Sequence, residues 1–241
     1  MTEDRDDGQL SRAMRELWGL VDKGRRGPKP AMSVRTIAAT AAALADAEGL
    51  EAVTMAAVAK RLDFTTMSLY RYVESRSDLL VAMVDEALGP PPVPNRRRGW
   101  RRQVEDWARA EGGQLLAHPW VLDVRAPTPP IGPNVMAWME HGFAALAASG
   151  LPPGTAADAL LIIDGYVRSN VQLTVQYATP GATEAWVSQL RTVLDADRFP
   201  TVHQVMLSGA FEDESYTEPQ GRDFDFGLSL LLDGLERLVH T

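Results

Sequence analysis

The fold is decided by the stretch VTMAAVAKRLDFTTMSLYRYVESRSDLL, residues 53–80, which predicts two short helices joined by a tight turn. Thr54 can cap a first helix over residues 55–62 with its hydroxyl oxygen. Asp63 tolerates the left-handed backbone that a tight turn needs, and Thr65 can cap a second helix only two residues later. Short helices around such a turn form a helix-turn-helix.

The second of these helices has an inward face and an exposed N-terminal end. Leu69 and Val73 are four residues apart, so they lie on one face and can pack inward. Recognition helices insert their N-terminal residues into the DNA major groove, which makes the exposed end a candidate DNA-binding surface. The side chains that we expect to face DNA, or to flank that face, are Thr54, Thr65, Thr66, Met67, Ser68, Tyr70, Arg71, Tyr72 and Arg76.

These side chains suit two tasks. Hydroxyls, an arginine and N-terminal backbone amides bind phosphate oxygens, which fixes the register of a protein on DNA. Base discrimination would fall to Thr66, Met67 and Tyr70, through hydrogen bonds or contacts with the thymine methyl group. Thr65 and Ser68 would contribute less. An alternative interpretation is a structural helical hairpin, because such turns also occur in proteins that do not bind DNA.

The composition favours a helical protein of the cytoplasm. The chain has 241 residues, 45% of them hydrophobic, which suffices for one large or two modest cores. No apolar run approaches the roughly 20 residues of a membrane-spanning helix, and the acidic start of the chain is unlike a secretory leader. Because the sequence contains no cysteine, disulfides and thiolate zinc sites are excluded.

Charge is distributed unevenly along the chain. The net charge of -8 argues at first against a nucleic-acid partner. Residues 23–84, however, carry nine basic and six acidic side chains, whereas residues 85–241 carry twelve and twenty. An acidic body limits non-specific binding, while a local positive face can still attract phosphates. The charge pattern is therefore compatible with DNA binding by the first of these two segments.

Residues 1–32 are predicted to form an extension with one short amphipathic helix and a basic linker. The helix is indicated by the helical spacing of Leu10, Met14, Leu17 and Val21. The linker GRRGPKP cannot continue this helix, because its glycines and prolines break helices. Three basic residues of this region could reach a DNA groove as an arm, or could remain solvated: Arg25, Arg26 and Lys29.

Residues 33–88 are predicted to form a three-helix, helix-turn-helix DNA-binding domain, extended by one further helix. Ser33 caps the first helix, and Gly49 ends it. Ser75 and Asp78 form a capping box for the last helix. The GPPPVP that follows marks a domain boundary, because four prolines in six residues leave hydrogen bonds for neither helix nor sheet.

Residues 95–241 are predicted to form a second, entirely helical domain, so that the fold class is all-α. Apolar spacing and helix-breaking residues indicate helices near residues 100–115, 135–146, 156–178, 183–194, 201–207 and 223–239, with a short one starting at Pro119. Thr155 is expected to cap the longest of them. No strand pairing is predicted.

A resemblance to the tetracycline-repressor (TetR) family of transcriptional regulators is carried by LDFTTMSLYRYVESRSDLL, with TMAAVAKRL before it and ALADAEGLEAV further upstream. It runs from about Ser33 to Leu88. Asp63 stands where the family usually has Gly, Ala56 where Arg is common, and Arg76 where Lys is usual. In the second half, resemblance to the branch that contains the tetracycline repressor itself is carried by LLAHPW, GLPPGTAADALLIIDGYV and FDFGLSLLLDGLERL.

The resemblance implies a homodimer that binds an operator in double-stranded DNA and a small-molecule effector. In such proteins the long helix and the last helix pair with their copies in a second subunit. The broad apolar face of the last helix supports this role, and its candidate dimerisation residues are Leu228, Leu231, Leu232, Leu235 and Leu238. Gly227 and Gly234 would allow close approach. The alternative is that both helices only complete the core of one subunit.

The second domain also implies a ligand cavity. Its candidate apolar lining is Trp107, Met136, Trp138, Met139, Phe143, Leu161 and Tyr166. Its candidate polar anchors are His118, Arg125, Asp164 and Asn170. Most of these residues could equally be ordinary core. We expect the effector to be a small, mostly apolar organic molecule.

His118 is the best placed of the polar anchors. In the tetracycline repressor, the histidine before the corresponding short helix binds the metal that accompanies the drug. The acidic partner of that metal would fall near Thr174, which cannot supply a carboxylate. The sequence therefore predicts a metal-free site and no cofactor.

No catalytic site is visible in the sequence. It has no G-x-S-x-G, no H-E-x-x-H, no glycine-rich phosphate loop and no cysteine nucleophile, and its four histidines lie far apart. The pattern therefore favours a regulator that is not an enzyme, namely a repressor released from a palindromic operator by its effector. The competing class is a small-molecule binding protein or helical enzyme whose helix-turn-helix is only structural.

Overall fold

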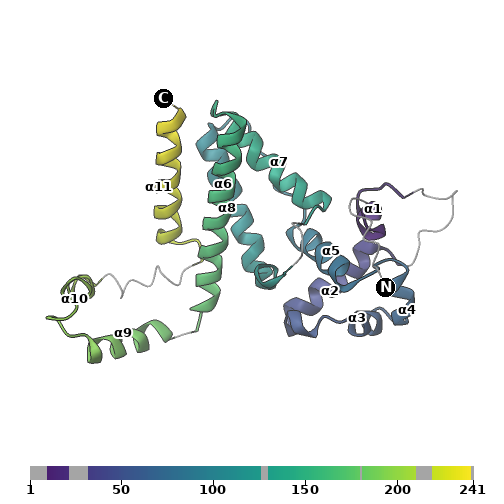
Figure 1. Ribbon diagram of the computed structural model, residues 1–241, viewed down its shortest axis with the longest axis horizontal. Coiled ribbons are helices and arrows are strands. Elements are labelled where there is room, and N and C mark those ends of the chain that lie inside the picture. Colours follow the sequence, from purple (N-terminus) through teal and green to yellow (C-terminus); the bar gives the residue numbers. More distant parts are fainter. Residues whose placement is uncertain (1–9, 22–31, 126–129, 180, 210–218, 240–241) are drawn as a thin grey trace, which may run out of the picture.

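The computed structural model describes residues 10–21, 32–125, 130–179, 181–209 and 219–239. Every regular element in these ranges is a helix, as Figure 1 shows, and no strand occurs within them. The predicted all-α fold class is therefore confirmed. None of the described helices is both long enough and apolar enough to cross a membrane.

The N-terminal part gathers short helices around one core (Figure 1). Its elements are α1 (Arg12–Leu17), α2 (Val34–Glu48), the 3-10 helix η1 (Leu50–Ala52), α3 (Met55–Arg61), α4 (Thr66–Tyr70) and α5 (Arg76–Leu88). α2 packs along α5, and α1 lies against both. The core contains side chains without any exposed surface, among them Ile37, Leu69, Leu79 and Met83.

Hydroxyl caps begin all the α-helices of this part. In each case the side-chain oxygen accepts a hydrogen bond from the backbone amide three residues later, at 3.0 to 3.3 Å. The capping residues are Ser11, Ser33, Thr54, Thr65 and Ser75. Each cap satisfies a backbone amide that the helix leaves unpaired, which is why the predicted helix starts of this domain are correct.

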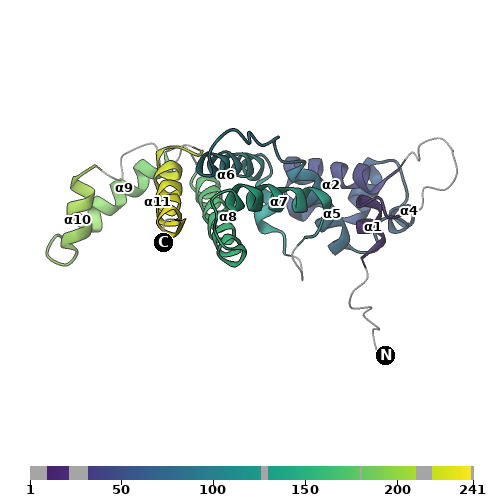
Figure 2. The same ribbon diagram turned by 90° about the horizontal axis from the view of Figure 1, so that it is seen from above.

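The C-terminal part is a helical bundle. It contains α6 (Trp100–Ala117), the 3-10 helix η2 (Pro119–Asp123), α7 (Pro133–Ala147), α8 (Pro153–Gln176) and α11 (Arg222–Val239). α8 packs against α6, α7 and α11. Two further helices, α9 (Ala182–Val193) and α10 (Pro200–Leu207), extend away from the bundle (Figures 1 and 2).

Several helix boundaries differ from those that the sequence predicts, and two of these differences have a clear physical cause. α8 begins at Pro153 with Pro152 at its N-cap, and Thr155 is not its cap. Proline lacks the amide that the first turn leaves unpaired, so it fits these positions without any loss of hydrogen bonding. α1 ends at Leu17, and Val21 lies outside it because Gly19 turns the chain with a φ of 70°.

Candidate functional site

The turn between α3 and α4 has the predicted backbone. Asp63 adopts a left-handed conformation with a φ of 59°, which aspartate tolerates better than most residues. The amide of Phe64 donates to the carbonyl oxygen of Ala59 at 3.0 Å and closes the turn. α3 and α4 therefore form the helix-turn-helix that the sequence predicts.

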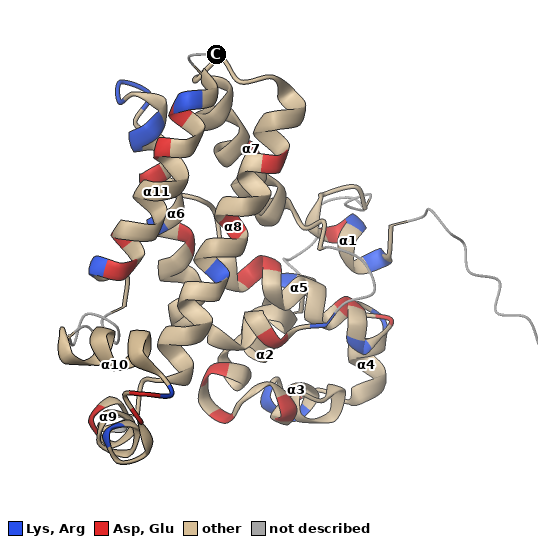
Figure 3. Cartoon of the chain, turned by 60° about the vertical axis from the view of Figure 1, so that its left-hand side comes forward, with Lys and Arg blue, Asp and Glu red and all other residues tan. Residues whose placement is uncertain are grey.

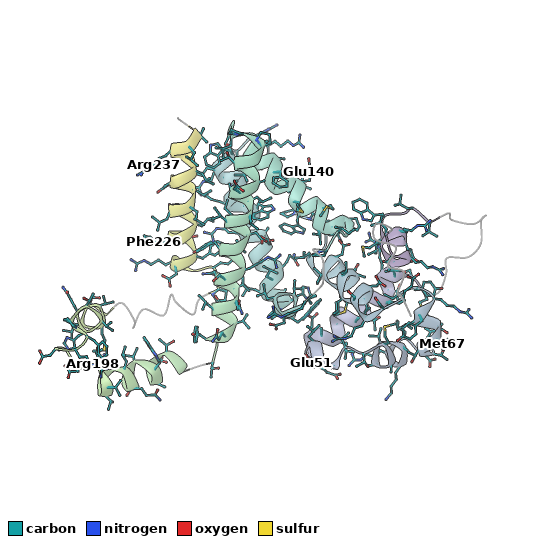
Figure 4. All side chains as sticks on the ribbon, viewed as in Figure 1. Glu51, Met67, Glu140, Arg198, Phe226 and Arg237 are labelled. Atoms are coloured by element: carbon teal, nitrogen blue, oxygen red, sulfur yellow. The ribbon has the colours of Figure 1, made fainter. Side chains whose placement is uncertain are left out.

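α4 has one buried face and one exposed face. Leu69, together with Val73 just after the helix, has no exposed surface, and the pair anchors α4 on the core. On the outer side, Met67 is 75% exposed and Tyr70 is 43% exposed. Figure 4 shows Met67 at the outer edge of the domain. Both side chains are thus free to contact base edges, as recognition-helix residues do.

The hydroxyls near α4 are partly engaged within the protein. Oγ1 of Thr54 accepts from the amide of Ala57 at 3.1 Å, and Oγ1 of Thr65 accepts from the amide of Ser68 at 3.2 Å. The hydroxyls of Thr65 and Ser68 also lie 2.9 Å apart, within hydrogen-bond distance. Thr66 is half-buried, and its hydroxyl makes no hydrogen bond among the described residues. Thr66 therefore keeps more capacity for DNA than Thr65 or Ser68.

The basic residues around α4 differ in their surroundings. Arg71 and Arg76 are exposed and form no ion pair within the described part of the chain, which leaves them available for phosphate oxygens. Tyr72 is half-buried, and the guanidinium carbon of Arg12 lies 6.0 Å from its ring centroid, so Tyr72 serves mainly in packing. Figure 3 shows further basic residues around α3 and α4. The predicted basic arm lies outside the described residues: Arg25, Arg26 and Lys29.

A buried carboxyl group joins α5 to the C-terminal domain. Asp85 is 1% exposed, and its Oδ1 accepts hydrogen bonds from the backbone amides of Asn134 at 2.8 Å and Val135 at 3.1 Å. The side-chain amide of Asn134 donates to the carbonyl oxygen of Asp85 at 2.9 Å. Burial raises the pKa of Asp85, although the two amides oppose that rise. Asp85 therefore caps the N-terminus of α7 from another domain.

Two further contacts complete this α5–α7 joint, which we define as Asp85, Gly89, Gly132, Asn134 and Trp138. Nε1 of Trp138 donates to the carbonyl oxygen of Gly89 at 2.9 Å. A Cβ atom at Gly132 would overlap the carboxyl group of Asp85, so this position accommodates only glycine. This role of Asp85 was not predicted from the sequence. The available signal was its spacing three residues before Leu88, on the apolar face of the helix.

His118 takes part in a second contact between the domains. Its Nδ1 lies 2.8 Å from Oδ1 of Asp46, on α2, and Nε1 of Trp120 donates to the same oxygen at 2.6 Å. The rings of His118 and Trp120 meet edge to face, with their centroids 6.1 Å apart. The structure thus gives His118 a contact between the domains, and its role as a ligand anchor stays a prediction. No sequence pattern pointed to Asp46, because the contact joins residues more than seventy positions apart.

Part of the predicted ligand set comes together between α6 and α7. Nε1 of Trp107 donates to the carbonyl oxygen of Trp138 at 2.9 Å, and the two rings lie edge to face with centroids 6.4 Å apart. Both side chains are buried. Met136 and Phe143, also on α7, are half-buried. Trp107 and Trp138 thus pack together between α6 and α7, and the ligand-binding role of these four residues stays a prediction.

Other members of the predicted set point elsewhere. Leu161 is 71% exposed and Met139 is 41% exposed, so neither lines the interior of this chain. Arg125 is exposed as well. The hydroxyl of Tyr166 donates to two backbone carbonyl oxygens at the start of α11, both at 3.0 Å, and therefore fixes that helix. Asn170 is half-buried on α8. Helical spacing alone could not separate these positions from a cavity lining.

An acidic pair lies between α6 and α8. Glu111 is 4% exposed, and its Oε2 is buried without a hydrogen-bond partner among the described residues. Burial and the neighbouring Asp164 raise the pKa of Glu111 well above its ordinary value, whereas Arg168 lowers it. Nε of Arg168 donates to both carboxylate oxygens of Asp164 at 2.9 Å. The signal that the sequence offered was the helical spacing of Glu111 with Trp107 and Leu115.

The leucine face of α11 packs mainly onto its own chain. Leu228 is 2% exposed and Leu232 is 0% exposed, so the core of one subunit already covers them. Leu228 and Leu232 therefore serve the core of the single chain, and their role in dimerisation stays a prediction. The remaining predicted leucines are half-buried (Leu231 and Leu235) or exposed (Leu238).

Both parts of the chain match known families. Residues 31–83 match the bacterial regulatory proteins of the tetR family, and residues 92–239 match the tetracyclin repressor-like C-terminal domain. The HTH-type transcriptional repressor DrrR1 of Streptomyces coeruleorubidus is 36% identical over 99% of this chain and 90% of its own length. An HTH-type transcriptional regulator of Saccharopolyspora erythraea is 30% identical over 64% and 66% of the two chains.

Solved structures agree with these sequence relatives. ActR of Streptomyces coelicolor in complex with actinorhodin aligns with a TM-score of 0.75 at 27% identity, covering 86% of this chain and 96% of ActR. Apo ActR aligns with a TM-score of 0.72, covering 87% and 97%. The helix-turn-helix geometry and the bundle behind it thus recur together across these proteins. The chain therefore belongs to the tetracycline-repressor (TetR) family, whose members are DNA-binding transcriptional regulators and not enzymes.

Proposed function

We propose that this chain is a homodimeric repressor of the cytoplasm, which binds a palindromic operator and releases it when a small organic molecule binds the C-terminal domain. The observation that carries the proposal is α4, which holds Met67 and Tyr70 outward while Leu69 is completely buried. Recognition helices present outward side chains of this kind to base edges in the major groove. Similarity to a protein named as a repressor supports repression rather than activation.

The proposed dimer uses the outward faces of α8 and α11. Leu161 and Ile162 on α8 are 71% and 55% exposed, and Phe226 and Leu230 on α11 are 67% and 56% exposed. Exposed apolar side chains on adjacent helices favour an interface. A Cβ atom at Gly234 would meet nothing within 4 Å, so a partner helix has room to approach. A two-fold axis there would match the symmetry of a palindromic operator.

The proposed effector is a mostly apolar molecule held near Trp107 and Trp138. ActR was solved in complex with actinorhodin and with (S)-DNPA, which supports a small organic effector for this chain as well. The hydroxyl of Thr174 donates to the carbonyl oxygen of Asn170 at 2.9 Å, and a hydroxyl is a poor substitute for a metal-binding carboxylate. We therefore propose an effector that binds without a metal ion.

Release is proposed to occur by a population shift. The α5–α7 joint and the contact of Asp46 with His118 connect the two domains. An effector that prefers a form with these contacts rearranged would change the spacing of the two α4 helices. They must sit in successive major grooves, about 34 Å apart. Operator affinity then falls by the differential affinity of the effector for the two forms, and by no more.

Retardation of a labelled duplex from the gene's own upstream region tests the DNA-binding half. The wild-type protein should retard the duplex, and Tyr70→Ala should weaken binding about tenfold or more, the loss expected for one base contact. Val93→Ala is the matched control, since Val93 is 93% exposed and lies in the linker. Equal binding by Tyr70→Ala would remove α4 from the interface. A wild-type protein that binds no duplex would favour the structural hairpin.

A further inference from the structure

A cleft of about 530 Å³ lies at the seam of the two domains, beside the contact of Asp46 with His118. The N-terminal domain lines it with Asp46, Gly49 and Leu50, from α2 and η1, and the C-terminal domain adds η2, the end of α6 and the end of α8. Small-molecule sites commonly have volumes of about 300 to 1,000 Å³. Trp107 and Trp138 do not line this cleft, so it is distinct from the proposed effector site.

The charged side chains that line the cleft are carboxylates. They belong to Asp46 and Asp123, and neither Lys nor Arg occurs among the lining residues. Asp123 is exposed and has no hydrogen bond or ion pair within the described part of the chain. Oδ1 of Asp46 accepts from Trp120 and bonds to His118, whereas its Oδ2 has no partner among the described residues. The cleft therefore favours a positively charged group.

The other residues that line the cleft suit the apolar part of a ligand. Leu50, Leu122 and Val175 contribute aliphatic surface, and the amides of Gln172 and Gln176 lie at the α8 side. A ligand with one cationic group and one apolar group would satisfy both halves of the lining at once. Neither an anion nor a pure hydrocarbon would do so, because the first meets carboxylates and the second leaves them unpaired.

We propose that this cleft binds a small organic cation, an amine whose ammonium group lies at Asp46 and Asp123 and whose apolar body packs on Leu50, Leu122 and Val175. Leu50 is four residues before Thr54, the cap of α3. A ligand here contacts both the segment that leads into the helix-turn-helix and the C-terminal domain. Its binding is linked to the relative position of the two domains, and that linkage is reciprocal.

Calorimetric titration of the full-length protein with 1-naphthylmethylamine and with 1-naphthalenemethanol tests this proposal. The two probes share one aromatic ring system, and at neutral pH only the amine is charged. The amine should bind saturably and about tenfold or more tightly than the alcohol, as expected for a charge-assisted hydrogen bond. Asp123→Asn should remove that preference without affecting the fold, because Asp123 is exposed and unpaired within the described residues.

Two variants sharpen the test. Ala117→Trp would fill the cleft from its α6 wall and should abolish binding of both probes. Asp158→Asn is the matched control, because Asp158 is an exposed carboxylate of α8 outside the cleft, and it should bind the amine like the wild type. Equal binding of the two probes by the wild type, no saturable binding of the amine, or a preference for the amine that survives Asp123→Asn would each overturn the proposal. None of these titrations contains DNA, so they succeed or fail independently of the proposed repressor function.

Discussion

Glu111 is a source of pH-dependent stability at the scale of a single residue. It is buried between α6 and α8, and burial together with Asp164 raises its pKa. The folded protein therefore holds this proton more tightly than the unfolded chain does. Binding of this proton stabilises the folded protein fully at pH values below 4.5, the ordinary pKa of glutamate. This stabilisation is lost as the pH rises through the raised pKa of Glu111.

Glu111→Gln should therefore raise the free energy of unfolding at about pH 8, by roughly 1 to 3 kcal/mol, because it removes a buried group that must otherwise ionise or hold its proton. The gain should shrink towards about pH 5. Urea unfolding at both pH values measures it. Glu140→Gln is the control, because Glu140 is exposed on α7 (Figure 4). A variant less stable than the wild type at the higher pH would contradict this role of Glu111.

Arg76 contributes one exposed positive charge beside the recognition helix. Arg76→Ala should weaken binding to every duplex alike and reduce the slope of log affinity against log salt by about 1, as loss of one phosphate contact does. Fluorescence anisotropy over a range of salt concentrations measures the slope. Arg198→Ala is the control, because Figure 4 shows Arg198 far from the helix-turn-helix. An unchanged slope for Arg76→Ala would exclude the phosphate contact.

Local residue roles could be predicted from the sequence, and long-range roles could not. Thr54, Thr65 and Asp63 act on backbone within a few residues, so spacing and residue type suffice to predict their roles. His118 bonds instead to a residue of another domain, and this contact depends on how the domains pack. The burial of Asp85 likewise depends on α7, which follows it by almost fifty residues.

Among the helices, α5 and α7 connect the N-terminal domain to the bundle through the α5–α7 joint. Gly132→Ala should weaken it, because the new Cβ would overlap Asp85 and displace a carboxyl group that holds two backbone amides. We expect a loss of about 1 to 3 kcal/mol in the free energy of unfolding, measured in urea. Effector-induced release of the operator should weaken as well, because the joint links the two domains.

The chain offers a matched control for this variant. A Cβ atom at Gly113, inside α6, would meet nothing within 4 Å, so Gly113→Ala should stabilise the protein by up to about 1 kcal/mol. If Gly132→Ala instead proves as stable as the wild type and releases operator normally, the joint does not couple the domains.

The spacing of apolar residues predicts that a helix is present. It does not predict where the helix begins, because that depends on which residues can occupy the first turn. Prolines begin α7, α8 and α10, and the predicted start of each of these helices lies one to three residues late. The rule that proline fits the first turn could have corrected all three. The 3-10 helix η1 was not predicted, since three residues are too few for a hydrophobic period.

At the scale of the whole molecule, the outward faces of α8 and α11 are the proposed dimer interface. Phe226→Glu combined with Leu230→Glu should yield monomers, because two unpaired carboxylates buried at a subunit interface cost several kcal/mol. Both side chains are more than half exposed in one chain, so the fold of the subunit should survive. Light scattering gives the mass, and circular dichroism checks the fold.

Val93→Glu is the control for this double variant, because it places a carboxylate on an exposed apolar position of the linker. A double variant that scatters as a dimer would place the interface elsewhere. The sequence predicts an interface on the leucine face of α11, whereas the interface proposed here uses the outward side chains of the same helix. Apolar residues occur on both of its faces, and only the packing of α8 determines which face is covered.

Two α4 helices that bind successive major grooves of one palindrome require a fixed spacing between its half-sites, so changing that spacing is the decisive measurement. Anisotropy titrations compare the upstream duplex with a duplex carrying about five extra base pairs between its half-sites, half a helical turn. Two chains should bind each original duplex, and tight binding to the lengthened duplex should be lost because its half-sites face opposite sides of the DNA helix. Equal affinity for the two duplexes would show that the two α4 helices do not bind successive major grooves of one palindrome.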